Sequence, residues 1–280
     1  MSNSVIAPAE ADELRTEIPH SARIYDYFLG GEDNFPADRA VADQIVTMLP
    51  GGPIGARANR RFLVRAVQHA AGLGIRQFLD LGAGLPSANA THQVAQQISP
   101  DARVVYTDND PIVFAHARRL LGADQDGRTA FLQADFREPE AVLDAPETKE
   151  LLDLSQPVAL IAGALLHFIL DSADPYALLD RYKQALPAGS VLILTHSSPD
   201  FVSPEVRAAV DRLYNDLRVD LASRTHDEIE RFVTGQGWTP VGPGVVSVNE
   251  WYLDGEEAVA ADRETSREDA AGYAAIAVKA

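Results

Sequence analysis

The chain has 280 residues, 46% of them hydrophobic, which is enough to bury one full core and fits one enzyme-sized domain with appendages. It contains no cysteine, which excludes disulfides, thiolate zinc sites, iron–sulfur clusters and cysteine nucleophiles, including the covalent route to C5-methylated cytosine. The formal net charge of −17 repels polyphosphate backbones, so no nucleic-acid partner is expected, and no run of 18 apolar residues is present to span a membrane.

The first part of the chain, residues 1–18, is polar and acidic with alanine and proline. This composition predicts a mobile tail and not a secretory signal, so we expect a cytoplasmic protein. Residues 19–76 contain three amphipathic helical stretches, and Gly30-Gly31 ends the first of them. We interpret this segment as a helical lid that forms one compact unit with a domain at 77–280. The apolar stripes, interpreted as packing surfaces, are Ile24, Tyr27 and Phe28; Val41, Ile45, Met48 and Leu49; and Leu63, Val67 and Ala70.

An apolar run at residues 77–81 leads directly into Gly82-Ala83-Gly84. A doubly wound α/β sheet opens a nucleotide-binding site in this way, because a Cβ at either glycine would keep the backbone away from the ligand. The loop continues as Leu85-Pro86-Ser87, so Ser87 replaces the third glycine of a pyrophosphate fingerprint. Pro86 also removes an N–H that could serve a phosphate. The loop therefore favours a nucleotide ligand without phosphate.

A second β-rich run, residues 103–108, ends in Asp108, which is placed to hold a ribose diol. Asp80, just before Gly82, would repel a diphosphate but suits a ligand with a cationic amino acid part. S-adenosylmethionine (SAM) combines a ribose, an adenine, an ammonium and a sulfonium, and it has no phosphate. These residues therefore favour SAM over NAD.

Helix and strand signals alternate along the rest of the chain. Asp110-Pro111 predicts a helix start, with an N-cap followed by proline at the first helical position. Two terminal β-like pieces are expected to pair as a hairpin at the sheet edge. Together these signals predict a mostly parallel, seven-stranded α/β sheet of Rossmann type with helices on both faces, which resembles the sheet of class I methyltransferases. The further strands are expected at residues 129–133, 157–162, 190–195, 238–241 and 273–278, and the further helices after Asp174, Ser203 and Thr225.

Five sequence blocks are similar to an actinobacterial family of S-adenosyl methyltransferases, once described as a domain of unknown function. The likeness covers nearly the whole chain after the tail, and the Tyr-Asp-Tyr-Phe-Leu-Gly-Gly block is far more specific than the glycine loop. It implies the fold and SAM binding, with S-adenosylhomocysteine (SAH) as the product, and it does not identify the substrate. The blocks lie at residues 22–35, 58–63, 78–86, 105–111 and 165–168.

The resemblance to class I methyltransferases also implies roles for individual residues. Gly82, Ala83 and Gly84 would border the methionine part, with Asp80 near its ammonium, Asp108 at the ribose and Asn109 beside the adenine. Asp135 would accept a hydrogen bond from the adenine amino group, with Phe136 against the ring, although an exposed loop acid and a core phenylalanine are the alternatives. Gly163 would let the backbone approach the sulfonium and the acceptor.

His167 is the candidate general base, because it follows the fourth strand beside the predicted methyl site and titrates near neutral pH. Its segment resembles the Leu-His-Asp segment of small-molecule O-methyltransferases, with Phe168 in place of the acid. The alternative is a half-buried histidine that shapes the pocket. Enzymes that methylate planar amino groups have Asn/Asp-Pro-Pro-Tyr after the fourth strand. In this chain the strand is followed by Gly163-Ala164-Leu165-Leu166, so such acceptors are disfavoured.

The lid segment carries polar and aromatic residues beside its glycine pair, and we expect Tyr25 or Asp26 to reach the active site. A competing interpretation is that Arg23 and Asp26 form a solvated pair on one helix face, with little effect on stability.

The sequence thus predicts a SAM-dependent methyltransferase acting on a small molecule through oxygen or nitrogen. A SAM-binding sensor without transferase activity is the alternative, and a nicotinamide-dependent oxidoreductase is a weaker one. No metal site is expected, since His226-Asp227-Glu228 fits a capping box better than a ligand set.

Overall fold

The computed structural model describes residues 16–86, 89–121, 127–217 and 219–280. Most of the predicted tail and Ser87 lie outside these residues. Among the described helices, none has the length and apolar character needed to cross a membrane.

An eight-stranded sheet forms the centre of the molecule, in the order β3-β2-β1-β4-β5-β8-β6, with the short β7 paired to β8. The five strands from β1 to β5 are parallel, and β8 runs antiparallel to β5 and β6. The strands are β1 (Gln77–Leu81), β2 (Arg103–Asp108), β3 (Thr129–Gln133), β4 (Ala159–Gly163), β5 (Val191–Ser197), β6 (Trp238–Pro240), β7 (Val246–Ser247) and β8 (Gly272–Lys279).

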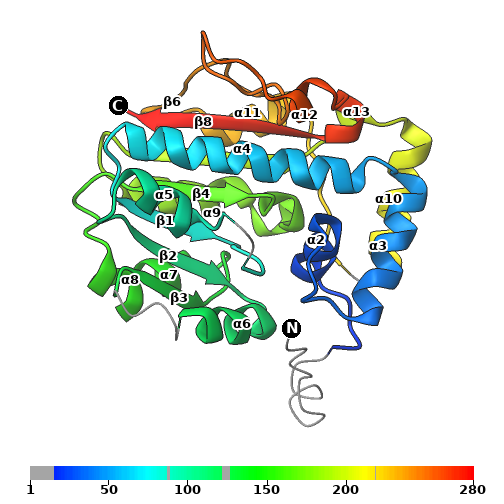
Figure 1. Ribbon diagram of the computed structural model, residues 1–280, viewed down its shortest axis with the longest axis horizontal. Helices are drawn as coiled ribbons and strands as arrows, with labels where there is room; N and C mark the ends of the chain where they lie inside the picture. Colours follow the sequence, from blue (N-terminus) through cyan, green and yellow to red (C-terminus); the bar gives the residue numbers. More distant parts are fainter. Residues whose placement is uncertain (1–15, 87–88, 122–126, 218) are drawn as a thin grey trace.

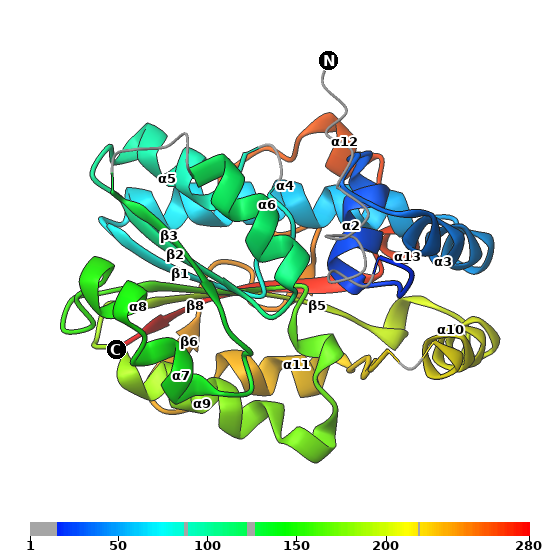
Figure 2. The ribbon, with the colours of Figure 1, turned by 90° about the horizontal axis from the view of Figure 1, so that it is seen from below.

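Helices cover both faces of the sheet, as predicted. Figure 2 shows α4, α5 and α6 on one side and α7, α8, α9 and α11 on the other. The helices are α2 (Ser21–Leu29), α3 (Pro36–Met48), α4 (Gly52–Gly72), α5 (Thr91–Ile98), α6 (Pro111–Leu121), α7 (Pro139–Leu143), α8 (Pro146–Leu151), α9 (Pro175–Ala185), α10 (Pro204–Asp216), α11 (His226–Val233), α12 (Ala260–Arg263) and α13 (Arg267–Ala270), with 3₁₀ turns η1 (Leu166–Phe168), η2 (Asp171–Ala173) and η3 (Pro199–Phe201).

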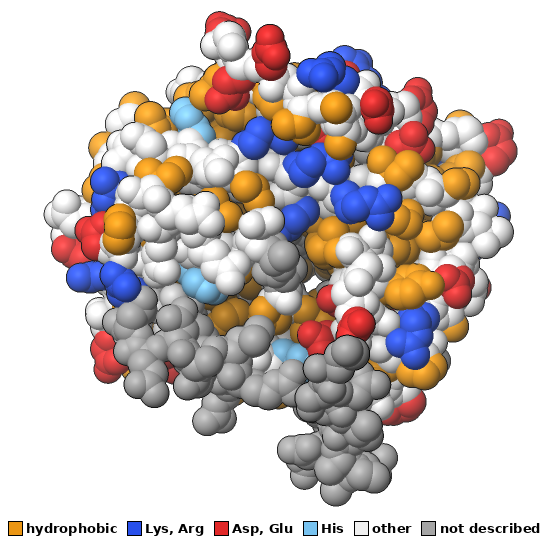
Figure 3. All heavy atoms as spheres, viewed as in Figure 1, with side chains coloured by type: hydrophobic (Ala, Val, Ile, Leu, Met, Phe, Trp, Pro, Cys, Tyr) orange, Lys and Arg blue, Asp and Glu red, His pale blue; other side chains and the backbone are white. Residues whose placement is uncertain are grey.

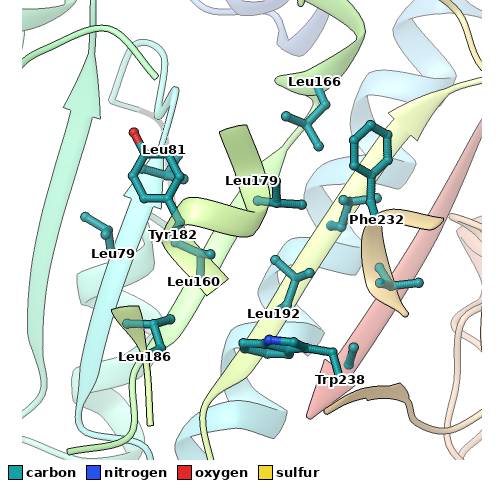
Figure 4. Close-up of a cluster of buried hydrophobic side chains, with 14 of the residues drawn as sticks. Leu79, Leu81, Leu160, Leu166, Leu179, Tyr182, Leu186, Leu192, Phe232 and Trp238 are labelled. Atoms are coloured by element: carbon teal, nitrogen blue, oxygen red, sulfur yellow. The ribbon is translucent and has the colours of Figure 1, made fainter. Parts of the chain in front are cut away.

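Each face of the sheet has its own buried cluster. On one face, strand leucines pack against Leu179 and Tyr182 of α9 and Phe232 of α11 (Figure 4). On the other, Phe62 and Val67 of α4 pack with residues of β1, β2, β4, β5 and β8. The central strands are apolar on both faces because both faces are covered.

The two terminal strands pair antiparallel at the edge of the sheet, as predicted. β8 lies between β5 and β6, so β6 forms the edge, and β7 is an additional short strand. Ala274, Ala275, Ile276 and Ala277 are all fully buried, because both faces of the sheet are covered at β8.

The segment predicted as a lid has two structural parts. The long helix α4 packs on the sheet and contributes to its core. The helices α2 and α3 lie beyond the carboxyl ends of the strands, where α3 contacts α10 (Figure 1). Ile24, Val41, Ala42 and Ile45 form a separate small cluster between these helices. Only α2 and α3 are thus placed to act as a cover.

Candidate active site

A cavity of about 650 Å³ lies at the carboxyl ends of β1, β2, β4 and β5, beneath α2 and the start of α4. Binding sites in open parallel sheets occur at this edge. All the predicted cofactor-binding and catalytic residues line this one cavity: Tyr25, Asp26, Asp80, Gly82, Ala83, Gly84, Asp108, Asn109, Asp135, Phe136, Gly163 and His167.

The glycine loop after β1 has the conformation that its sequence predicts. Gly82 and Gly84 have φ angles of +61° and +66°, a region that other residues rarely adopt. A Cβ at Gly82 would lie 2.6 Å from Leu165 Cδ1, and one at Gly163 would lie 3.0 Å from Leu63 Cδ1. The side chains of Leu165 and Leu63 therefore pack directly on these two glycines at the wall of the cavity.

Asp108 is buried at the end of β2 and is tied to the glycine loop. Its Oδ2 accepts a hydrogen bond from Gly84 N at 2.9 Å, and its Oδ1 accepts one from Asp110 N at 2.9 Å. Burial raises the pKa of Asp108, while these two backbone hydrogen bonds oppose the rise. Each carboxylate oxygen retains a lone pair that can accept from a ligand hydroxyl.

Asp80 accepts a 2.7 Å hydrogen bond from Thr91 Oγ1, and burial raises the pKa of this carboxyl to about 6, with the Arg60 charge opposing the rise. Arg60, on α4, donates to Asn89 O, and its Nε is buried without a partner among the described residues. Basic side chains gather over α4 on the face shown in Figure 3. Arg60 was not among the residues predicted for the site, although it lies in one of the blocks that carry the family resemblance.

The residues expected at the adenine differ in how they are held. Asn109 Nδ2 donates to Asp135 Oδ2 at 3.3 Å, and Arg137 donates to both oxygens of Asp135, which lowers the pKa of that carboxyl. Phe136 is buried and stacks on Tyr182 with ring centroids 5.2 Å apart. Its ring thus packs in the core, which supports the packing interpretation of this residue.

His167 lies in η1, and its Nδ1 accepts a 3.4 Å hydrogen bond from Ser197 N. Burial, with a contribution from the positive charge of Arg224, lowers the pKa of His167 to about 3. Its ring meets His196 edge-on at 5.4 Å. An imidazole with so low a pKa is a weak base, and the nitrogen that accepts from Ser197 is not free to take a proton from a substrate.

Tyr25 and Asp26, the two lid residues expected at the active site, both line the cavity but have different hydrogen-bond partners. Tyr25 OH donates to Ala56 O at 3.1 Å and accepts from Asn59 Nδ2 at 2.8 Å, and burial raises its pKa. Asp26 accepts from Asp33 N at 3.0 Å and from Asn34 Nδ2 at 2.8 Å, so its carboxylate closes the turn between α2 and α3.

The competing interpretation, in which Arg23 and Asp26 form a solvated pair, is wrong. The Arg23 side chain is only 4% exposed, and its Nε lies 3.6 Å from Asp38 and 3.8 Å from Asp110. Arg23 therefore joins α2 to α3 and to the residue that begins α6, because helix α2 is covered on the side that a solvated pair would need.

Comparison with known proteins identifies the family. The chain matches a family described as S-adenosyl methyltransferase over residues 7–280. The chain belongs to this family. Its cofactor is SAM, as the glycine loop and Asp108 predicted, and the nicotinamide alternative is not supported.

Solved structures agree with this assignment. The methyltransferase is 42% identical to a DUF574 family protein from Streptomyces avermitilis MA-4680, covering 95% of this chain and 100% of that chain with a TM-score of 0.88. It is 38% identical to a "putative methyltransferase" from Thermobifida fusca YX, covering 98% and 99% with a TM-score of 0.87. An O-methyltransferase family protein from Burkholderia thailandensis shares the fold at 15% identity and a TM-score of 0.51, covering 98% and 68%. No curated protein matches the chain.

The residues of the cavity fit SAM. Gly82 and Gly84 adopt the positive φ angles that carry the loop along the cavity wall. The half-buried carboxylate of Asp80 suits an ammonium and the buried carboxylate of Asp108 suits a ribose diol. Arg60 Nε, which has no partner among the described residues, suits a carboxylate. This combination of two acids and one guanidinium matches a zwitterionic amino acid attached to a nucleoside.

Proposed function

We propose that this methyltransferase transfers the methyl group of SAM to a small-molecule oxygen or nitrogen acceptor bound in the same cavity. The observation that carries the proposal is that one cavity joins the glycine loop and Asp108 to His167 and Tyr25. A cofactor and an acceptor bound there would be neighbours, as an in-line displacement requires.

The cofactor half of the cavity is formed by the ends of β1 and β2. Arg60 and Asp80 would bind the carboxylate and ammonium, Asp108 the ribose and Asn109 the adenine edge. When bound there, SAM supplies an electrophilic methyl group on a sulfonium. The protein's own contribution is to orient the cofactor and to exclude water.

The acceptor half is formed by η1, the end of β5, α2 and the start of α4. Its walls are largely apolar, with Phe28, Leu63, Leu165, Phe168 and Leu217 among them. Asn59 Oδ1 and Ser197 Oγ are buried there without a hydrogen-bond partner among the described residues. An apolar pocket with few polar groups is typical of small-molecule sites.

Helices α2 and α3 act as the lid in this proposal. Arg23 and His20 of the α2 region contact Asp110, which lies two residues from Asp108. The lid is thus held at the cofactor-binding edge by its contacts with Asp110, and its release would open the cavity to the acceptor.

The first test is calorimetric titration with SAM, SAH and NAD. Asp108→Ala should lose micromolar binding of the two sulfur ligands, while Asp101→Ala, an exposed acid before β2, should retain it. Binding of NAD without SAM would contradict the cofactor half of the proposal.

Transfer itself is tested with SAM carrying a tritiated methyl group and mixtures of small phenols, acids and amines. Protein that binds SAH but labels none of these would favour the alternative of a SAM-binding sensor.

A further inference from the structure

A chain of hydrogen bonds starts at Arg224 and ends at His167. Arg224 is buried and donates to Leu166 O and Ile169 O, both at 2.9 Å, and its Nη1 lies 3.1 Å from His196 Nε2. A guanidinium has donors only, so His196 Nε2 must accept. Arg224 thereby fixes both the backbone around η1 and the tautomer of His196.

The next step fixes the neighbouring peptide. Burial lowers the pKa of His196 well below its ordinary value, so this imidazole is neutral and carries its single proton on Nδ1. Nδ1 lies 2.6 Å from Ser197 O and donates to it. The Ser197 N–H in turn donates to His167 Nδ1 at 3.4 Å.

The last hydrogen bond of the chain sets the tautomer of His167. Since its Nδ1 accepts, the neutral ring carries its proton on Nε2, and Nε2 has no hydrogen bond to a described residue. His167 lines the cavity. The ring therefore presents a donor to the acceptor half, which is the opposite of what a general base requires.

We propose that His167 donates an Nε2–H hydrogen bond to the methyl acceptor, and that the acceptor is a small-molecule carboxylate, which is converted to its methyl ester. This inference rests on the proposed function and names the substrate class for the same site. A carboxylate is ionised at neutral pH and needs no base, whereas a phenol or an ammonium would have to lose a proton first.

The charges around His167 favour an anion. His196 meets its ring edge-on, and Arg224 lies beyond His196. Burial lowers the pKa of both histidines, and the positive charge of Arg224 lowers both further. Asp171 pairs with Arg224 at 2.6 Å, but its side chain is 80% exposed, so solvent screens its negative charge. Ser197 Oγ, buried without a partner among the described residues, offers a second donor beside His167.

The transfer balances without a proton acceptor. One carboxylate oxygen forms the O–CH₃ bond while the S–CH₃ bond breaks and leaves its electron pair on sulfur. The negative charge of the acceptor and the positive charge of the sulfonium cancel, giving a neutral ester and the thioether SAH. The second carboxylate oxygen accepts from His167.

The tautomer is measured first, by nitrogen NMR of the SAH-bound protein with labelled histidine, using His167→Gln to assign the signal. We expect a protonated Nε2 and a bare Nδ1 at neutral pH. A proton on Nδ1 overturns the inference, whatever the protein methylates.

Substrate class is measured with tritiated methyl groups on SAM. The acceptors are phenylacetate, para-cresol and benzylamine, together with a low-molecular-weight extract of Streptomyces avermitilis. Alkali releases methyl esters as volatile methanol and leaves ethers and methylamines intact. We expect volatile label. Label that resists alkali overturns the inference but leaves methyl transfer standing, and no label from protein that binds SAH overturns both.

Two substitutions of His167 distinguish a hydrogen-bond donor from a general base. His167→Gln retains a donor and cannot act as a base, so it should keep most of the transfer rate, while His167→Leu should lose at least tenfold. His226→Gln, at an exposed histidine outside the cavity, is the matched control. Equal loss in His167→Gln and His167→Leu contradicts the donor role.

Discussion

The backbone N–H of Gly84 donates a 2.9 Å hydrogen bond to the carboxylate of Asp108, so the loop after β1 and the acid at the end of β2 form one unit. Asp108 thus orders the loop and still faces the cavity. Any change in this loop is expected to affect cofactor binding as well as stability.

Gly82→Ala should weaken SAH binding and destabilise the protein. At φ +61° an alanine costs roughly 1–2 kcal/mol of conformational strain. Its Cβ would also lie 2.6 Å from Leu165 Cδ1, so Leu165 must move at the edge of the cavity. Calorimetry and urea denaturation measure the two effects.

Gly74→Ala is the matched control for this change. Gly74 has φ +97°, and a Cβ there meets nothing within 4 Å. Because φ +97° lies outside the left-handed region that L-residues can adopt, this variant should show at least as much backbone strain, with SAH affinity unchanged. Equal loss of affinity in both variants would show that the contact with Leu165 is irrelevant.

Asp80 should make both stability and cofactor binding depend on pH. Its pKa is raised to about 6 in the folded protein, so the folded state binds this proton more tightly than the unfolded state. The stabilising contribution is therefore fully present below the ordinary pKa near 4 and is lost as pH rises through about 6. Asp80→Asn should raise the melting temperature of the ligand-free protein at pH 7 and not at pH 4.

Binding of a cation reverses this trend, because the ammonium of SAM favours the ionised carboxyl. Affinity for SAH should rise as pH increases through about 6, with a proton released on binding. Calorimetry in buffers of different ionisation enthalpy measures that proton. A pH profile identical in the wild type and Asp80→Asn would argue against contact with the ammonium.

Arg60→Ala should lower SAH affinity at least tenfold, because Arg60 is placed to bind the methionine carboxylate. Methylthioadenosine lacks the amino acid part, so its affinity should not change. Arg57→Ala, one helical turn away and exposed, is the control. Parallel losses for both ligands would place Arg60 elsewhere than at the carboxylate.

Arg23→Ala should destabilise the protein by about 3 kcal/mol, because it leaves the buried Asp38 and Asp110 without their cation. Arg207→Ala removes an exposed pair with Asp211 and should cost less than about 0.5 kcal/mol. Urea denaturation compares them. Similar small losses would mean that Arg23 does not hold the lid.

The features that sequence alone predicted are those set by neighbouring residues. Strand 129–133 and the helix after Asp110 are recognisable because burial and capping impose short-range patterns. Gly82 and Asp108 are recognisable because a positive φ and a strand-end acid leave a local signature. The sequence blocks that resemble the methyltransferase family extended the prediction to the cofactor, SAM.

Tertiary structure decided what depends on residues far apart in the chain. Arg23 pairs with Asp38 and Asp110, although its own helix offered the closer Asp26. The insertion of β8 between β5 and β6 requires a partner on each side, which no short pattern specifies. His167 follows the fourth strand, where a base was predicted, but burial and the charge of Arg224 lower its pKa, and Ser197 N–H donates to its Nδ1. The pKa and the tautomer of a side chain depend on the groups that surround it in space, and only the folded chain brings those groups together.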